Sequence, residues 1–220
     1  MHRALLVPQP GVTTLVLVRH GQPDRLGEGA TRDEKIDPPL SERGRRQADA
    51  VAEVLAEEPV TAVYTSDLRR ALETGSAIGS HHALEPTAWH ELREFEGFRD
   101  VPAGESVRAW VPPALMEGMK ERFVRERRWD SFPFSEPRDE FRNRVASAME
   151  GILGTNPGGR VVVACHGGVI NAYVAHLWDT HADMLFNPAH ASISRIVARE
   201  DRRAIHTLNE LHHLPDLVDY

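Results

Sequence analysis

Cysteine is almost absent from the chain, which has a single one, Cys165, among its 220 residues. One cysteine excludes an internal disulfide and a thiolate metal cluster. Long apolar runs are lacking too, since no stretch approaches the roughly 18 consecutive apolar residues of a membrane span. The apolar run before Pro8 is too short for the core of a signal peptide. We therefore expect a cytoplasmic protein without a membrane partner.

Positive charge is in deficit, with 33 acidic residues against 26 basic ones and a net charge of -7. Nucleic-acid binders need a positive excess to displace counterions, so we expect no nucleic-acid partner and only a local site for any anion. Lysine is the scarcer basic residue, present only as Lys35 and Lys120. Because nearly all basic residues are arginine, an abundance of arginine alone says little about function.

Repeats and low-complexity segments are missing, and strands instead alternate with helical patterns. Apolar runs over 14–20, 60–66 and 159–168 predict buried strands. Such alternation is typical of an α/β protein, so we predict a three-layer α/β/α sandwich around a mostly parallel sheet. The alternating segment 191–200 predicts a later strand at an edge of the sheet.

Two helix starts can be placed from capping residues. Ser41 is the predicted N-cap of a helix that carries apolar residues at i, i+3, i+4 and i+7 and ends before Pro59. Ser66 or Asp67 is the predicted N-cap of a second helix, directly after the second strand. Both helices then serve as connections that cover the sheet.

Residues 97–140 interrupt this rhythm with five prolines and a helical stretch over about 114–129. An insertion of this length is either a lid or disordered. Its aromatic residues favour a packed lid: Trp110, Phe123, Trp129, Phe132 and Phe134. We predict one domain over 1–220 that carries 97–140 as a lid insertion.

Polar side chains follow each of the three buried strands. The first strand leads to Arg19 and His20, the second to Arg69 and Arg70, and the third to His166. Carboxyl ends of parallel strands meet at one rim of a sheet, so these side chains are expected to converge there. Guanidinium groups match the oxygens of a tetrahedral anion, which predicts a phosphoryl ligand.

Backbone donors strengthen this expectation. Gly167 opens a helix, and the N–H groups at a helix start favour negative charge. Gln22 adds a backbone or amide donor after the first strand, or is a solvated loop residue. A metal is the competing interpretation of two histidines, but metal-binding histidines come with carboxylates and without cationic neighbours, so we expect no metal.

Catalysis at such a site needs a nucleophile and an acid. A neutral imidazole can attack phosphorus and hold the phosphoryl group until water removes it. A carboxylic acid near the leaving oxygen would supply the proton. The segment 89–97 offers three candidates, Glu91, Glu94 and Glu96.

Taken together, these residues resemble the histidine phosphatase superfamily, which includes cofactor-dependent phosphoglycerate mutase. The run Arg19-His20-Gly21 is similar to the family's Arg-His-Gly signature, which implies that His20 becomes phosphorylated and that Arg19 binds phosphate. The segment 66–75 resembles the family's Ser-x-Leu-x-Arg-Ala-x-x-Thr element. That resemblance assigns phosphate binding to Arg70 rather than to its neighbour.

Three further elements extend the resemblance over most of the chain. Residues 92–94 are similar to a Leu-x-Glu element, which implies that Glu94 is the proton donor. The segment 164–170 resembles the second histidine motif and implies that His166 lies in the phosphate pocket. The stretch 40–48 is similar to the opening of the family's first helix.

Within this family we predict a phosphomonoester hydrolase that works without a cofactor through a phosphohistidine intermediate on a small phosphorylated metabolite, because the fuller nucleophile-loop signature of the mutases is not found. Two alternatives stay open. One is phosphoryl transfer of the phosphoglycerate mutase type, and the other is a non-catalytic phosphate-binding protein, which has no need of the acid. The chain has Pro23 and Leu26 where many members have Thr and Asn, so one side-chain phosphate ligand is missing.

Two remaining features receive no role in this chemistry. Cys165 does not fit a cysteine-based phosphatase, because the residue six positions on is Asn171 and not the arginine such an enzyme needs. In a strand of valines Cys165 is expected to be a small buried side chain. The histidine pairs at 81–82 and 212–213 lie in expected surface segments without a partner motif.

Overall fold

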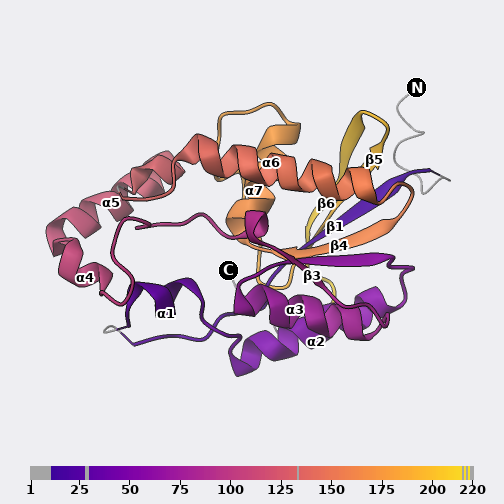
Figure 1. Ribbon diagram of the computed structural model, residues 1–220, viewed down its shortest axis with the longest axis horizontal. Helices are drawn as coiled ribbons and strands as arrows, with labels where there is room; N and C mark the ends of the chain where they lie inside the picture. Colours follow the sequence, from indigo (N-terminus) through magenta and orange to yellow (C-terminus); the bar gives the residue numbers. More distant parts are fainter. Residues whose placement is uncertain (1–10, 28–29, 133, 215, 217, 219–220) are drawn as a thin grey trace.

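The computed structural model describes residues 11–27, 30–132, 134–214, 216 and 218. The segment before Pro8, on which part of the expected location rests, lies outside them. Six strands form one sheet in the order β3-β2-β4-β1-β5-β6 (Figure 1). The strands are β1 (Thr13–Arg19), β2 (Ala62–Ser66), β3 (Thr87–Trp89), β4 (Arg160–Cys165), β5 (Ile193–Arg199) and β6 (Arg202–Glu210).

Strand pairing is parallel in three of the five neighbouring pairs, β1 with β4, β2 with β4 and β2 with β3. The helices α2 (Glu42–Ala56) and α3 (Arg69–Ser80) cover one face, and α6 (Arg138–Thr155) and α7 (Gly167–Leu177) cover the other (Figure 1). The predicted three-layer α/β/α arrangement is therefore confirmed.

The two apolar cores come from the alternation of side chains along the central strands. In β1, Val16 and Val18 pack with Val51 and Leu55 of α2 on one face. Their neighbours Leu15 and Leu17 belong to the core on the other face, with α6 and α7. Successive strand residues point to opposite faces, so a strand covered on both faces must be apolar throughout.

Helix capping follows the prediction at α2 but not at α3. Ser41 is the N-cap of α2, and its hydroxyl accepts a hydrogen bond from the Gly44 N–H at 3.0 Å. The prediction for α3 is wrong, since the N-cap is Leu68, without a side-chain cap. The Asp67 carboxylate instead accepts two hydrogen bonds from Arg93, at 2.6 and 2.9 Å. The Asp67 carboxylate, which the local sequence predicts as a helix cap, therefore binds the guanidinium group of the distant Arg93 instead.

The predicted position of the late strand is also wrong. β5 lies between β1 and β6 and pairs antiparallel with both. The edge is β6, whose mixed polar and apolar residues are mostly half-buried and give no clear strand pattern. A hairpin joins the two strands at Glu200, which has a positive φ of 53°.

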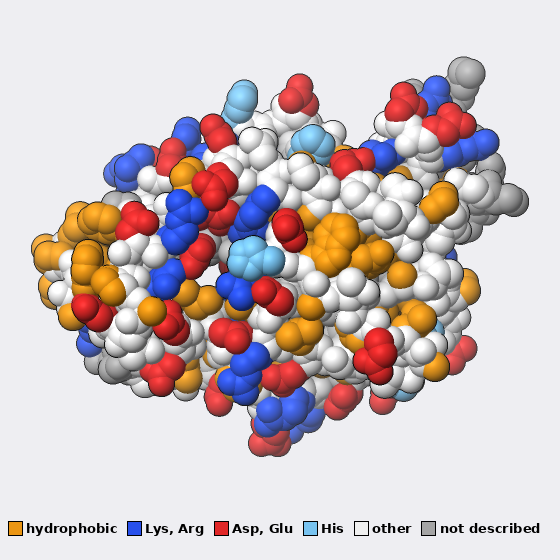
Figure 2. Space-filling view, in the orientation of Figure 1, with side chains coloured by type: hydrophobic (Ala, Val, Ile, Leu, Met, Phe, Trp, Pro, Cys, Tyr) orange, Lys and Arg blue, Asp and Glu red, His pale blue; other side chains and the backbone are white. Residues whose placement is uncertain are grey.

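The segment 97–140 contains α4 (Val107–Trp110), α5 (Pro113–Glu126) and the 3-10 turn η3 (Trp129–Ser131). Aromatic packing holds only part of it. Trp129 is 7% exposed and stacks on Phe95, with ring centroids 5.3 Å apart. Trp110 and Phe134 are 45% and 43% exposed, so they do not join this packing. In Figure 2 hydrophobic side chains gather at the end of the molecule where α4 and α5 lie.

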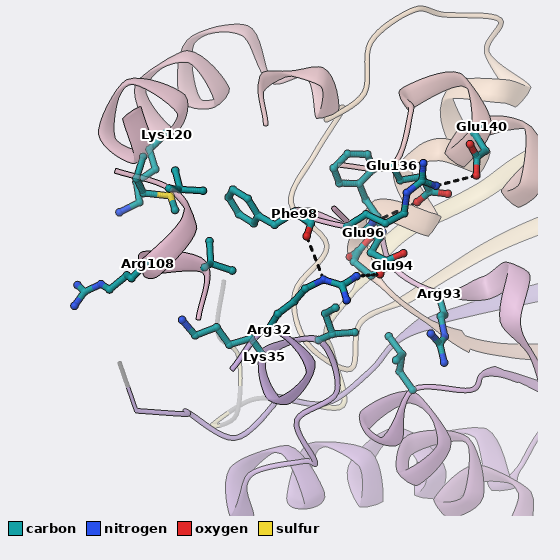
Figure 3. A pocket seen from close by; sticks show the side chains of 18 of the residues that line it. Arg32, Lys35, Arg93, Glu94, Glu96, Phe98, Arg108, Lys120, Glu136 and Glu140 are labelled. Carbon is teal, nitrogen blue, oxygen red and sulfur yellow. Dashed lines mark hydrogen bonds and ion pairs between the residues drawn. The ribbon is translucent and has the colours of Figure 1, made fainter. Parts of the chain in front are cut away.

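A cleft of about 1190 Å³ lies between this segment and α1 (Arg32–Ile36), a short helix in the loop after β1. Residues 90–99 form its inner wall, and α4 and α5 contribute the outer one (Figure 3). Arg70 and Glu94 line the cleft. It therefore reaches two of the residues that the sequence assigns to phosphate chemistry.

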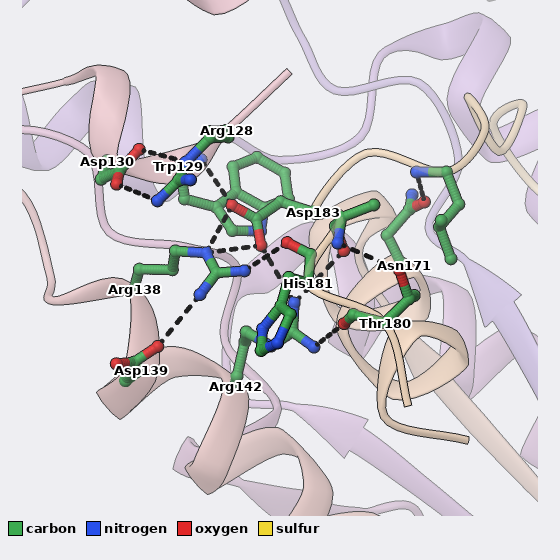
Figure 4. A network of polar contacts seen from close by, with 12 residues as sticks. Arg128, Trp129, Asp130, Arg138, Asp139, Arg142, Asn171, Thr180, His181 and Asp183 are labelled. Atoms are coloured by element: carbon green, nitrogen blue, oxygen red, sulfur yellow. Dashed lines mark hydrogen bonds and ion pairs between the residues drawn. The ribbon is translucent and has the colours of Figure 1, made fainter. Parts of the chain in front are cut away.

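Asp183, in the loop after α7, ties three elements together (Figure 4). Its carboxylate is fully buried and accepts hydrogen bonds from Arg138 Nε at 2.8 Å and Arg142 Nη1 at 3.1 Å, both on α6. It also accepts one from the Trp129 N–H at 3.0 Å. The start of α6 and the turn that carries Trp129 are thereby fixed to the body of the protein.

Replacing Asp183 with alanine is expected to lower the free energy of unfolding by about 3–5 kcal/mol, because it leaves two largely buried guanidinium groups without their carboxylate. The midpoint of thermal unfolding should fall by on the order of 10 °C. The matched control is Asp139→Ala, which removes an 84% exposed carboxylate from the same Arg138 and should change stability by less than about 1 kcal/mol. Similar losses in both variants would contradict this account.

Candidate active site

His20 follows β1 at the carboxyl edge of the sheet and is 5% exposed. Its Nδ1 lies 2.7 Å from the carbonyl oxygen of Gly21. A carbonyl only accepts, so Nδ1 carries the ring proton and Nε2 carries the lone pair. Nε2 accepts a hydrogen bond from Arg70 Nε at 3.1 Å. The basic nitrogen of His20 therefore faces the guanidinium group.

His166 follows β4 and is fully buried. Its ring lies edge-on to that of His20, with centroids 5.0 Å apart. Neither ring nitrogen of His166 has a hydrogen-bond partner within the described part of the chain. Buried polar atoms are nearly always satisfied, so two unpartnered nitrogens at one position point to a ligand.

Arg19 and Arg70 complete the convergence that the strand ends predict. Arg70 is 8% exposed and donates from Nη1 to the carbonyl oxygen of Ile36 at 2.7 Å. Arg19 donates to the carbonyl oxygen of Pro188, and its guanidinium lies over Gly167 at the start of α7. Arg69 is exposed, so only one of the two neighbouring arginines reaches the histidines.

Burial and neighbouring positive charge act on both imidazoles in the same direction. Burial lowers the pKa of His20 well below its usual value, and Arg70, His166 and Arg19 lower it further. Burial and the guanidinium groups of Arg70 and Arg19 likewise hold the pKa of His166 well below its usual range. Because a depressed histidine pKa favours the neutral ring, both imidazoles are uncharged at neutral pH.

Among the three candidate acids, only Glu94 joins this cluster. Its carboxylate accepts hydrogen bonds from the N–H of Gly168 at 3.0 Å and that of Phe95 at 2.9 Å. A Cβ on Gly168 would lie 2.1 Å from Glu94 Oε1, so only glycine lets the carboxylate approach the start of α7. Glu91 is exposed, and Glu96 pairs with Arg32.

The backbone of the Glu94 segment is held by an arginine of α6. Arg144 donates from Nη1 to the carbonyl oxygens of Glu91 and Arg93, at 2.8 Å each, and from Nη2 to that of Glu94 at 3.2 Å. Glu136 accepts from Arg144 Nε at 2.6 Å and neutralises it. The position of the carboxyl group therefore depends on a helix that begins more than 40 residues later.

The loop after His20 packs on α2. The backbone N–H of Gln22 donates to Gln47 Oε1 at 2.8 Å. The side-chain oxygen of Gln22 accepts from the Ser41 hydroxyl at 3.1 Å. This backbone donor is therefore engaged with the helix. A Cβ on Gly21 would lie 2.3 Å from the carbonyl oxygen of Gly44, so the loop can approach α2 only with glycine there.

Two residues near His20 were not expected from the sequence. The hydroxyl of Thr74 on α3 accepts from the Gly21 N–H at 3.1 Å and donates to the Arg70 carbonyl oxygen at 2.8 Å. The threonine of the 66–75 motif is the sequence signal that could have identified it. His190 lies with its ring centroid 5.6 Å from that of His20. No local motif marks His190, because the turn before β5 brings it there.

The paired histidines lie elsewhere. His213 Nε2 lies 2.9 Å from the carbonyl oxygen of Ala191 and supports that same turn, whereas His81 and His82 follow the end of α3. No cluster of three or more potential metal ligands occurs among the described residues. Within the same residues, none of the helices combines the length and apolar character needed to cross a bilayer.

Comparison with known proteins bears on this arrangement. The family model of the histidine phosphatase superfamily (branch 1) matches residues 15–211. A metal-independent phosphoserine phosphatase from Arabidopsis thaliana is 31% identical over 92% of this chain and 84% of its own. A glucosyl-3-phosphoglycerate phosphatase from Mycobacterium tuberculosis is 34% identical over 74% of each chain.

Solved structures agree with these sequence relatives. The native structure of a mycobacterial glucosyl-3-phosphoglycerate phosphatase matches with a TM-score of 0.68 and 25% identity, covering 90% of this chain and 99% of its own. The same protein in complex with inorganic phosphate matches with a TM-score of 0.63 and 26% identity, over 90% and 97% of the two chains. The family model spans more than half of the sequence, and the chain belongs to the histidine phosphatase superfamily.

Proposed function

We propose that the protein hydrolyses phosphomonoesters of small metabolites through a phosphohistidine on His20. The observation that carries this proposal is the unprotonated Nε2 of His20, which lies among two guanidinium groups and a second neutral imidazole. The phosphatases reported above, related over most of the chain, support the same chemistry.

The first step transfers the phosphoryl group to the protein. Arg19 and Arg70 bind its oxygens, and the phosphoryl group takes over the hydrogen bond that Arg70 gives to His20. His20 Nε2 attacks phosphorus, the bond from phosphorus to the ester oxygen breaks, and Glu94 as a carboxylic acid protonates the leaving oxygen. His166 donates its ring N–H to an equatorial oxygen, where charge is spread.

The second step returns the protein to its starting state. Glu94, now a carboxylate, takes a proton from water, and the resulting hydroxide attacks phosphorus and breaks the bond to Nε2. Inorganic phosphate leaves, and His20 and Glu94 are regenerated. The guanidinium groups supply the charge neutralisation that a metal ion would otherwise provide, so the proposal includes no metal and no cofactor.

The remaining parts of the chain fit this function. We place the whole of 1–220 in one domain, in which 97–140 is a lid that forms a wall of the cleft. A cytoplasmic location suits a chain whose single cysteine, Cys165, is buried and free. A phosphorylated small molecule is then the partner of the site.

Replacing His20 with alanine should abolish turnover. It should also abolish the acid-labile phosphate label that the wild-type protein acquires from a labelled phosphomonoester, with EDTA present in both labelling reactions. The reason is that no other described imidazole presents an unprotonated nitrogen to Arg70. His81→Ala, at the far end of α3, serves as the control and should retain both properties. A label that persists on the His20 variant would refute the assignment.

Arg70 and Arg69 offer a matched pair of variants. Arg70→Ala should lower kcat/KM for p-nitrophenyl phosphate by about 10²–10³, because it removes a donor aimed at developing charge. Arg69→Ala should have much less effect, since its side chain is exposed. If the Arg69 variant were the more damaged, the phosphate site would have to be reassigned.

Removing the acid should affect poor leaving groups most, because an alkoxide needs a proton as it departs and nitrophenolate needs little help. Glu94→Gln should therefore lose far more activity on an alkyl phosphate than on p-nitrophenyl phosphate, measured as kcat on each substrate. Glu91→Gln is the control and should stay close to wild type on both. Equal losses on the two substrates would show that Glu94 positions the substrate instead.

A further inference from the structure

The cleft outside the phosphate site is larger than a small leaving group requires. Its volume of about 1190 Å³ exceeds the roughly 300–1,000 Å³ typical of pockets for drug-sized ligands. In the proposed reaction the phosphoryl group lies at the inner end of the cleft, where Arg70 and Glu94 line it. Most of the cleft is therefore available to the part of the substrate that leaves.

The middle of the cleft has an apolar wall. Phe98, Val107, Val111 and Met116 line it, and the two valines are buried beside Phe98 in a small core of their own. In Figure 3 the ring of Phe98 lies between the inner residues Arg93 and Glu94 and the outer residues Arg108 and Lys120. A flat or aliphatic group can pack against this wall.

Most of the charged side chains of the inner cleft already neutralise one another. Arg32 pairs with Glu96, and Arg93 pairs with Asp67. Arg99 and Arg144 are paired in the same way, with Glu140 at 3.0 Å and Glu136 at 2.6 Å respectively. These arginines brace the walls and are not free to bind a ligand's charge without losing a partner.

Lys35 differs from them. It is exposed and lines the cleft, and its ammonium group has no hydrogen bond or ion pair within the described residues. The only other lysine of the chain, Lys120, lines the same cleft and pairs with Glu117 only at 3.9 Å, with both side chains exposed. Such a pair contributes little, so the outer cleft keeps positive charge.

The helix that carries Lys35 is fixed on both sides of it. The Arg32 side chain donates from Nε to the carbonyl oxygen of Phe98 at 3.1 Å. The backbone N–H of Arg32 donates to the carbonyl oxygen of Glu105 at 2.7 Å. On the other side, the carbonyl oxygen of Ile36 accepts from Arg70. Lys35 is thus attached to a backbone that contacts both the phosphate-binding arginine and the apolar wall.

We propose that the substrate's leaving group is elongated, with an apolar middle packed against Phe98 and a second anionic group, a carboxylate or a phosphate, bound by Lys35. This inference rests on the proposed hydrolysis at His20 and names the class of substrate for that site. A compact, strongly hydrated ammonium group suits an anion that ends a flexible chain, because it imposes no fixed bidentate geometry.

Three phosphomonoesters with the same aromatic leaving group test the proposal. They are 3-[4-(phosphonooxymethyl)phenyl]propanoate, its methyl ester, and the analogue that ends in a propylphosphonate. Wild-type protein should favour the two anionic probes over the methyl ester by about fivefold in kcat/KM, the upper end of what an exposed ion pair contributes. A preference for only one of them would support the proposal and identify the anion as carboxylate or phosphate.

Substitutions at Lys35 separate the contribution of its ammonium charge to substrate preference from that of its aliphatic chain. Lys35→Met should remove the preference and leave kcat/KM for the methyl ester within about twofold, because the side chain is exposed. Lys35→Glu should reverse the preference. Arg125→Met, on α5 but not lining the cleft, removes the same charge as a control and should keep the wild-type preference.

The outcomes distinguish this inference from the proposed function. Equal kcat/KM for all three probes in wild type, or a loss of preference in Arg125→Met as large as in Lys35→Met, would overturn the role of Lys35 while hydrolysis stands. Failure of the wild-type protein to hydrolyse any probe or p-nitrophenyl phosphate, with no labelled His20, would overturn the proposed function itself.

Discussion

Two imidazoles and two guanidinium groups are packed together at the carboxyl edge of the sheet, where water solvates them poorly. Concentrating positive charge in a low-dielectric environment is costly, and the cost is limited because both His20 and His166 stay neutral. The hydrogen bond from His20 Nδ1–H to Gly21 then determines that the free lone pair faces Arg70. In the proposed mechanism, nucleophilicity and affinity for a dianion thus arise from the same packing.

The rest of the fold keeps this cluster in place. The residues that follow β1, β2 and β4 converge because these three strands are neighbours in the parallel part of the sheet. Glu94 comes from a segment with only a short strand, and it depends on hydrogen bonds from Arg144 of α6 and on the space that Gly168 leaves. The start of α6 is in turn held by the buried carboxylate of Asp183. The position of Glu94, the proposed acid, is therefore linked to the stability of the opposite layer.

Chemistry and substrate choice are assigned to different parts of the chain. The residues around His20 lie on the sheet and its covering helices, whereas the cleft is bounded by α1 and by the segment 97–140. Arginine and carboxylate pairs give these walls their shape and leave Lys35 as an available charge. On this proposal, changes in the walls alter which leaving group is accepted without altering the residues proposed to transfer the phosphoryl group.

The sequence by itself determined the three buried strands, the Ser41 cap and the residues that follow each strand, because apolar periodicity, capping and short motifs are local properties of the chain. Only the tertiary structure decided the features that depend on distant partners. Asp67 failed as a cap because Arg93, 26 residues later, holds its carboxylate. His190 reaches His20 because β5 pairs antiparallel with β1, a pairing between segments more than 170 residues apart that no local pattern encodes.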